Sequence, residues 1–419
     1  MGARILLLII TCFWVLVAQA SESLTLQVAI EKAYASNPNI AAAEANADAE
    51  QGAIRSQSFL EDPHLGYMHE NNMNFMEQQQ GPMNSLFVSQ QIKFPAKYFL
   101  LGRAQSARMT AAQEMAKQKK LEIRSKVVSG YYGLFVTERV LALLQVQRES
   151  LREIASTAET RYATGSVPQQ DEMKAHVEQT MLEKDILMVE EERTTTTANL
   201  AAAIGANNLD GPELSKELHA PKVMANLSDL SKTLEHRSKR IKEAQARVDE
   251  SDALKSLAHL SYAPDFNLSY RRAVGTYFNQ NAYSAAVEIT FPLWFFAKQT
   301  GEVSAASAHA DQAVRELEAT RVDHVSEVKS LIAKVQSTGK LLEIYETGLI
   351  PQATSTLNSS RGSYRAGRSG FIELLDSERS LYNMQIAYYR TLAQFAENVA
   401  KLEETLGESI SSLPFGDRL

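Results

Sequence analysis

The sequence predicts a mainly α-helical protein with a membrane-spanning β part, in which a long coiled-coil barrel carries a β-barrel that oligomerisation completes. Three observations lead to this fold class. The chain of 419 residues begins with an export signal, the remainder is one structural unit written twice, and each unit combines long heptad stripes with short alternating segments. Heptad stripes are typical of helices packed side by side, and alternation with a period of two is typical of strands.

Residues 1–20 are interpreted as a secretory signal peptide and are excluded from the fold. Arg4 supplies the positive start, residues 5–17 form an apolar run, and small residues at a cleavage site end the segment. The run is short for a membrane span, although an uncleaved anchor helix is the alternative. The one cysteine, Cys12, lies inside this segment, so the exported chain is expected to have no thiol for a disulfide or a metal site.

Composition and motifs argue against several functions. The formal net charge of -7 is mild and both signs are interspersed, which argues against a nucleic-acid partner. The sequence contains no Gly-x-Ser-x-Gly nucleophile, phosphate-binding loop or His-Glu-x-x-His metal site, so neither an enzyme activity nor a cofactor is expected. Of the scattered histidines, His324 on a heptad stripe is expected to be packed or solvated rather than a ligand.

The exported part repeats itself with a period of about 200 residues, far longer than the period of a solenoid. Four landmarks recur in the same order, and each lies 197 to 202 positions from its partner. The sequence therefore predicts a first repeat at 21–204, a linking segment at 205–235, a second repeat at 236–407 and a tail at 408–419. The landmark pairs are Ile40 with Ile241, Pro63 with Pro264, Phe94 with Phe291, and Tyr162 with Tyr364.

Each repeat is expected to hold a helix, a strand hairpin, a very long helix, a turn and a further helix. Residues 38–61 and 239–262 are rich in helix-forming side chains. Residues 96–161 and 298–363 carry apolar side chains at alternating steps of three and four, as in a coiled coil. A helix of that length spans roughly 100 Å, so the long helices must pack side by side as an extended bundle or tube. The stripe residues are Val128, Tyr131, Phe135, Leu151, Ala155, Ala158, Val325, Val328, Ile332, Val335, Leu342, Tyr345 and Leu349.

Two strand hairpins are predicted, at 63–94 and at 264–292. Apolar and polar residues alternate over about ten positions in each, as in the strands of a transmembrane barrel, whereas a soluble half-buried sheet is the alternative. Four strands cannot close a barrel, and lipid offers no partner to an open sheet edge, so several copies must combine. Aromatic residues near the strand ends would form a girdle at the membrane interface; they are Tyr67, Phe94, Tyr270, Phe291 and Trp294.

A glycine-containing turn joins the last two helices of each repeat. Gly165 and Gly367 suit the left-handed position that closes a helix. In the first turn, Pro168 can open the next helix, and Ser166 with Gln169 has the spacing of a capping box. Local chemistry alone predicts an ordinary helical hairpin at both places.

A group of histidines and methionines lies at the predicted outer end of the first hairpin. Imidazoles and thioethers are ligands that soft metals prefer. An adaptable polar loop is the simpler interpretation, and we do not predict a metal site here. The residues concerned are His64, Met68, His69, Met73 and Met76.

The export signal, the doubled helix–hairpin–helix unit and the two Tyr-x-x-Gly turns together resemble the TolC family of outer-membrane efflux proteins, over essentially the whole exported chain. Three segments are similar to the branch that serves heavy-metal resistance pumps: residues 36–40 (Ser-Asn-Pro-Asn-Ile), 62–65 (Asp-Pro-His-Leu) and 89–97 (Ser-Gln-Gln-Ile-Lys-Phe-Pro-Ala-Lys). Many members of that branch are lipoproteins, whereas Ser21 stands here in place of the cysteine that would carry the lipid.

The resemblance implies a homotrimeric channel in the outer membrane of a Gram-negative bacterium, with twelve strands in contact with lipid and twelve helices across the periplasm. It would dock onto a periplasmic adaptor and an inner-membrane pump of the resistance-nodulation-division type, as a passive exit duct for heavy-metal cations. A periplasmic coiled-coil adaptor without a pore is the alternative. The resemblance makes the two turns the adaptor-docking surface, through Arg161, Tyr162, Gly165, Ser166, Tyr364, Gly367, Arg368 and Ser369.

A periplasmic gate is also expected from this arrangement. Threefold symmetry would place Asp171, Glu373 and Asp376 near the narrow end of the tube as rings of carboxylates, which attract cations. Arg365, together with the other arginines of the turns, lies where it could pair with these acids in a closed state. The alternative is that the acids complement helix N-termini, where negative charge is favourable.

Overall fold

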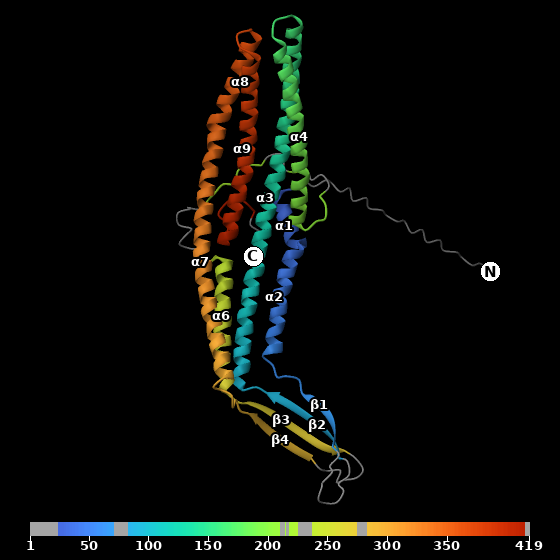
Figure 1. The fold of residues 1–419 in the computed structure, drawn as a ribbon, viewed down its shortest axis with the longest axis vertical. Coiled ribbons are helices and arrows are strands. Elements are labelled where there is room, and N and C mark those ends of the chain that lie inside the picture. Colours follow the sequence, from blue (N-terminus) through green and yellow to red (C-terminus); the bar gives the residue numbers. More distant parts are fainter. Residues whose placement is uncertain are drawn as a thin grey trace, which may run out of the picture.

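A computed structural model describes residues 24–70, 83–209, 214, 218–224, 237–274 and 283–414. The molecule is long and narrow, with helices along its axis and a small sheet at one end (Figure 1). The predicted signal peptide lies outside the described residues. The elements of the first repeat are α1 (Leu26–Ser36), α2 (Pro38–Gln57), β1 (His64–Glu70), β2 (Met83–Ile92), α3 (Pro95–Ala163) and α4 (Gln169–Ile204). Those of the second are α6 (Lys239–His259), β3 (Asp265–Val274), β4 (Tyr283–Thr290), α7 (Lys298–Ile344), α8 (Ile350–Arg365) and α9 (Phe371–Leu406).

Two different sets of helices flank the long helix α3. In the half nearer the sheet, α3 packs between α2 and α6, and α6 packs on α7. In the far half, α3 packs between α4 and α9, and α9 packs on α7 and α8. Each half is therefore a row of helices whose lateral edges are α2 and α4 on one side and α7 and α8 on the other.

The predicted heptad stripes face the interior of this row. Val128 and Tyr131 in α3 and Val328 in α7 are 0 % exposed, and His324 is packed at 2 % exposure. One window of α3 is apolar enough to cross a membrane by composition, but 56 % of it is buried inside the protein. Packing between helices, rather than lipid, accounts for this apolar stretch.

Both long helices form, and the second contains one irregularity. α3 runs without interruption over 69 residues, whereas a π-helical turn at Tyr345–Leu349 separates α7 from α8. Pro351 follows in the first turn of α8. Proline lacks an N–H, and its ring crowds the carbonyl four residues earlier, so it normally interrupts a helix. The extra residue of the π-turn accommodates Pro351, and the helix continues beyond it.

The four strands form one antiparallel sheet in the order β1-β2-β3-β4. The two predicted hairpins are present, and pairing of β2 with β3 joins the repeats, so that Val88 lies between Leu65 and Tyr270. Every residue of β4 is exposed. Among the described residues, β1 and β4 each have a strand neighbour on one side only, so the sheet of a single chain is open at both edges.

The tail is joined both to the linking segment and to the helices. Val223 forms an isolated bridge with Ser411. Arg124 of α3 and Glu403 of α9 form an ion pair at 2.7 Å, with both side chains fully buried. Glu403 also accepts hydrogen bonds from the amides of Ile410 and Ser411. This pair therefore fixes the tail against two helices at mid-height of the molecule.

Candidate functional site

The two turns lie together at the end of the molecule farthest from the sheet (Figure 1). Each glycine has the left-handed conformation predicted for it, with φ of +70° at Gly165 and +69° at Gly367. In the first turn the amide of Ser166 donates to the carbonyl of Arg161 at 2.8 Å, and the second turn repeats this bond at 2.9 Å. Such a bond closes a helix in the Schellman motif, so both turns end their helices in the same way.

The capping box predicted for the first turn is wrong. The hydroxyl of Ser166 lies 3.1 Å from that of Thr164, and α4 begins at Gln169 without a side-chain cap. Pro168 precedes the helix instead of occupying its first position. The physical reason is that Ser166 completes the Schellman turn, which commits its backbone to closing α3 before the chain reaches the start of α4.

Arg161 connects the two turns. Its guanidinium lies 4.5 Å from the centre of the Tyr364 ring and donates to the Tyr364 carbonyl at 3.1 Å. Tyr364 is 4 % exposed and packs edge-on against Phe371, whereas its repeat partner Tyr162 is 40 % exposed. The equivalent tyrosines therefore differ, since one joins the tips and the other faces solvent. Two more predicted docking residues lie in the second turn, where Arg368 is exposed and Ser369 is half-buried. Arg365, the predicted partner of the gate acids, is exposed at the end of α8.

The candidate gate acids lie at the beginnings of the two helices that leave the turns. Glu373 and Asp376 are exposed on α9, and Asp171 is half-buried in the first turn of α4. Within the described part of one chain, none of the three forms an ion pair with the arginines of the turns. Instead, Arg379 of α9 holds Glu178 of α4 at 2.6 Å.

A buried carboxylate that the sequence reading missed lies two turns into α9. Glu378 is 2 % exposed, and Arg361 of α8 lies 3.8 Å away. The guanidinium of Arg361 donates to the hydroxyl of Ser150 in α3 at 2.9 Å. Burial raises the pKa of Glu378, and the nearby hydroxyl and guanidinium offset this only in part. Its place between Leu374 and Leu381 on the apolar stripe is the signal that could have revealed it.

Replacing Glu378 with glutamine is expected to stabilise the protein at neutral pH. Because the pKa of this carboxyl is raised in the folded state, its contribution to stability is complete below the ordinary value of 4.5 and is lost as the pH rises through the folded value. Glutamine keeps the shape without ionising. Thermal denaturation in detergent should therefore show equal stability near pH 4 and a more stable variant near pH 7.

The exposed acid Glu373, one turn earlier on α9, offers a matched control. Glu373→Gln should change the stability much less than Glu378→Gln does, because an exposed carboxyl loses little solvation on folding. A Glu378→Gln variant that becomes less stable than the unaltered protein as the pH rises would contradict the prediction. That outcome would mean that attraction to Arg361 outweighs the cost of burial.

The five aromatic residues proposed for the girdle lie at two levels of the sheet. Tyr67 and Tyr270 are inside strands, and Phe94, Phe291 and Trp294 follow the strand ends nearest the helices. Four of them are 44–69 % exposed, and Phe94 is half-buried. A single chain in water leaves these rings largely uncovered.

Strand β1 separates the candidate metal ligands. His64 and Met68 lie on one face and His69 on the other, because successive side chains of a strand alternate. His69 contacts the side chain of Asn84. Among the described residues, no group of three His, Cys, Asp or Glu side chains is placed to hold a metal ion, and the two further methionines of the cluster lie outside those residues.

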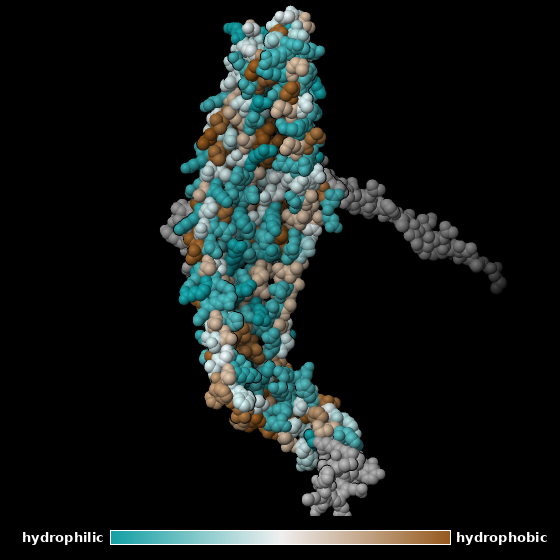
Figure 2. All heavy atoms as spheres, viewed as in Figure 1, coloured by the Kyte–Doolittle hydropathy of each residue, from teal (hydrophilic) through white to brown (hydrophobic). Residues whose placement is uncertain are grey.

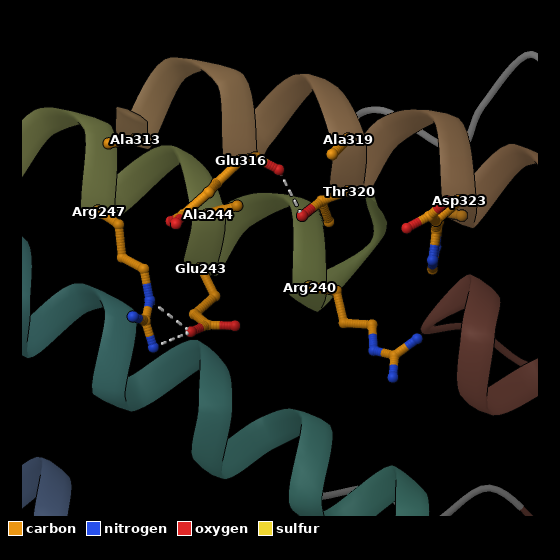
Figure 3. A pocket seen from close by; sticks show the side chains of 10 residues that line it. Arg240, Glu243, Ala244, Arg247, Ala313, Glu316, Ala319, Thr320 and Asp323 are labelled. Carbon is orange, nitrogen blue, oxygen red and sulfur yellow. Dashed lines mark hydrogen bonds and ion pairs between the residues drawn. The ribbon is translucent and has the colours of Figure 1, made fainter. Parts of the chain in front are cut away.

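A groove of about 530 Å³ runs between α6 and α7 (Figure 3). On its wall, Arg247 binds Glu243 of the same helix at 2.8 Å, and Arg240 pairs with Glu327 at 3.1 Å. Burial lowers the pKa of His324, which favours the uncharged ring, although Glu327 acts in the opposite direction. Paired charges of both signs make this a polar, water-compatible wall.

Comparison with protein families decides the nature of this arrangement of helices, sheet and turns. The family model described as outer membrane efflux protein matches residues 29–206 and, a second time, residues 230–408. The chain belongs to the outer membrane efflux protein family. The two matched segments correspond to the two predicted repeats, and together they cover most of the chain.

Individual relatives of this efflux protein agree with the family. The chain is 24 % identical over 396 residues to the cobalt-zinc-cadmium resistance protein CzcC of Cupriavidus metallidurans, covering 93 % of this chain and 91 % of that protein. The outer membrane protein VceC of Vibrio cholerae has a similar fold, with a TM-score of 0.79, 18 % identity and coverage of 92 % of this chain and 96 % of VceC. The MtrE outer membrane channel of Neisseria gonorrhoeae, in its open state, gives a TM-score of 0.77, 16 % identity and coverage of 92 % and 89 %.

The comparisons confirm the predicted fold class, location and function. This efflux protein is an outer-membrane channel component with a long helical periplasmic part and a membrane-spanning β part. The alternative of a periplasmic adaptor without a pore finds no support.

Proposed function

We propose that three copies of this efflux protein close into one duct, with a barrel across the outer membrane and a tunnel of helices below it. The open edges of the sheet carry this proposal. Within the part of a single chain that the structure describes, β1 and β4 each have one unpaired edge, and lipid cannot satisfy the exposed N–H and C=O groups. Pairing β4 of each copy with β1 of the next removes both edges, and a ring of twelve strands is wide enough to enclose a channel.

The lateral edges of the helix row support the same closure. On α4, Met173, Val177 and Met181 lie one turn apart and are 43–58 % exposed. On the opposite edge, Leu341 and Ile344 of α7 are 42 % and 51 % exposed. An apolar stripe on a helix is normally covered by a neighbour. Joining the edge of one copy to the opposite edge of the next would cover both stripes.

This closure gives the tunnel a polar wall. Arg124 and Tyr132 of α3 face the tail and the linking segment. The Arg124 side chain donates a hydrogen bond to the carbonyl of Pro414, and the Tyr132 hydroxyl donates one to the carbonyl of His219. Glu122, Lys126 and Ser129 line a groove on the opposite face of the same helix. If the tail and linking segment lie outside the tube, the face bearing these polar residues lines its interior.

We infer heavy-metal cations as the cargo, and a periplasmic adaptor with an inner-membrane pump of the resistance-nodulation-division type as the partners. The similarity to a cobalt-zinc-cadmium resistance protein over 93 % of the chain supports this cargo. The turns are the part of the duct farthest from the sheet, so an adaptor reaching up from the inner membrane would meet them first. Exposed Tyr162 and Arg368 would be presented to it there.

The exported protein is expected to fractionate with the outer membrane and to form a trimer. Closing three sheets into one barrel satisfies every strand edge, which no smaller number achieves with room for a channel. Differential membrane fractionation followed by light scattering of the detergent-solubilised protein measures both properties. A monodisperse monomer obtained without detergent would overturn the proposal.

Neutralising Glu373 and Asp376 together is expected to alter conduction through the duct. Rings of carboxylates at a constriction attract cations and repel one another, so Glu373→Gln with Asp376→Asn should raise the closed-state conductance or lower the preference for cations. Block by multivalent cations added at the turn end should also weaken several-fold. Single-channel recording in a planar bilayer measures all three quantities.

The exposed acid Glu149 on α3, which pairs with Arg152 at 2.9 Å, provides the control for this experiment. Glu149→Gln removes one exposed charge of the same sign away from the predicted constriction and should leave the recordings unchanged. If the double variant also behaves like the unaltered channel, Glu373 and Asp376 face away from the pore, and Glu373 serves only the N-terminus of α9.

A further inference from the structure

Three lysines from two helices meet at mid-height of the molecule. Lys239 and Lys242 lie in the first turn of α6, and Lys117 lies on α3. The first turn of α6 is at the level where α9 ends, about halfway along the row of helices (Figure 1). Partial burial lowers the pKa of Lys239, and the ammonium groups of Lys242 and Lys117 lower it further, although Glu114 acts in the opposite direction. The three ammonium groups therefore lie within electrostatic reach of one another.

This gathering of positive charge is unfavourable for the folded chain by itself. The N-terminus of a helix favours negative charge, yet the first turn of α6 contains no acidic residue and holds both lysines. Lys117 is held by Glu114 at 2.6 Å, whereas Lys239 and Lys242 form no ion pair within the described residues. Because like charges at short range repel one another, the surplus of positive charge points to an anionic partner that would offset it.

The lysines lie on the side of the helix row that carries the tail. Lys117 and Arg124 are seven positions apart on α3 and so share a face, and Arg124 donates to the carbonyl of Pro414 in the tail. Lys239 lies beside Gly407, the residue that ends α9. Since α3 and α6 lie between the lateral edges of the row, joining these edges to neighbouring copies would leave the lysines on the outer wall of the tube.

Charge, rather than apolar area, is the means of recognition at this height. Hydrophilic side chains predominate along the middle of the helical row on the face shown in Figure 2. The formal net charge of the whole chain is -7, so the chain as a whole repels an anionic polymer, which only a local basic surface would attract. Lys242 is exposed, and the side chain of Lys117 is 41 % exposed, so both are accessible to such a polymer.

We propose that Lys117, Lys239 and Lys242 form a docking surface for peptidoglycan, whose peptide stems carry the carboxylates that these ammonium groups would bind. The proposal rests on the proposed function, because a duct that crosses the periplasm must pass through the cell-wall mesh between the two membranes. The wall would then brace the tunnel from outside at mid-height. The partner is assigned as this polymer and not as the adaptor, which would meet the duct at the turns.

Cosedimentation of the detergent-solubilised protein with insoluble peptidoglycan sacculi tests this surface. The unaltered protein should sediment with the sacculi at low salt, and the bound fraction should decline as added salt screens the charges. Lys239→Gln with Lys242→Gln should weaken the binding about fivefold, because two exposed ion pairs of ordinary strength are lost. Lys117 is left in place, since its removal would leave the carboxylate of Glu114 without its ion-pair partner. Sacculi whose carboxyl groups have been converted to amides should not retain the protein.

The opposite face of α3 supplies a matched control. Lys126 is nine positions from Lys117 and therefore on the opposite face, which Lys119 shares because it lies seven positions before Lys126. Lys119→Gln with Lys126→Gln removes the same charge on the tunnel side, which the sacculi cannot enter, and should leave the binding unchanged. The docking surface is overturned if the unaltered protein stays in solution, if amidated sacculi retain it, or if the two double variants bind alike. Single-channel conductance of the same preparations separates the two proposals: a conducting protein that ignores sacculi leaves the duct standing, whereas an unaltered protein that does not conduct counts against the duct.

Discussion

Replacing Arg124 with methionine is expected to destabilise the folded chain by about 3–5 kcal/mol, the usual cost of removing one partner of a buried ion pair. Both side chains of the Arg124–Glu403 pair are 0 % exposed. Arg124 also donates to the carbonyl of Pro414 at 2.7 Å, so the substitution leaves an uncompensated carboxylate and a released tail. Exposed ion pairs, in contrast, contribute about 0–1 kcal/mol.

Urea unfolding of the detergent-solubilised protein measures this effect, and the same helix offers a control. Lys126 pairs with Glu122 at 2.7 Å in an exposed position, so Lys126→Ala should cost less than about 1 kcal/mol. A double variant, Arg124→Met with Glu403→Gln, should recover part of the loss, because glutamine leaves no buried charge. An Arg124→Met variant as stable as Lys126→Ala would show that the pair contributes no more than an exposed one.

Replacing both Gly165 and Gly367 with valine is expected to abolish efflux while the barrel still assembles. Each glycine has a positive φ near 70°, a conformation that costs an L-residue roughly 1–2 kcal/mol. The valines should therefore unwind both Schellman turns and displace the surface proposed to dock the adaptor. The sheet lies at the opposite end of the molecule, so trimer formation should persist.

Cadmium or zinc resistance of cells carrying the variant, together with trimer yield from outer membranes, measures these two outcomes. Gly362 provides the control, because it lies in α8 close to the second turn, has open space around it and no positive φ. Gly362→Val should therefore keep resistance nearly intact. A double turn variant that confers full resistance would remove the turns from the proposed docking surface.

Much of the fold followed from local rules. The repeat, the heptad stripes and the alternating strands each depend on residues close in sequence, so their helices and strands could be predicted. The left-handed conformation of the two turn glycines could also be predicted from local sequence, because a residue without a side chain suits a positive φ. The prediction that Ser166 caps the next helix was wrong because two local motifs, the capping box and the Schellman turn, competed for this residue. The Schellman turn, which closes the preceding helix, took precedence.

Other features depend on contacts between distant parts of the chain, which no local pattern encodes. The pairing of β2 with β3 across the repeats is one such feature. The Arg124–Glu403 pair, 279 positions apart, is another. The difference between buried Tyr364 and exposed Tyr162 is a third. Equivalent sequence positions have unequal surroundings because the two repeats pack against each other. A buried carboxyl group such as that of Glu378 becomes recognisable only when the helices that cover it are in place.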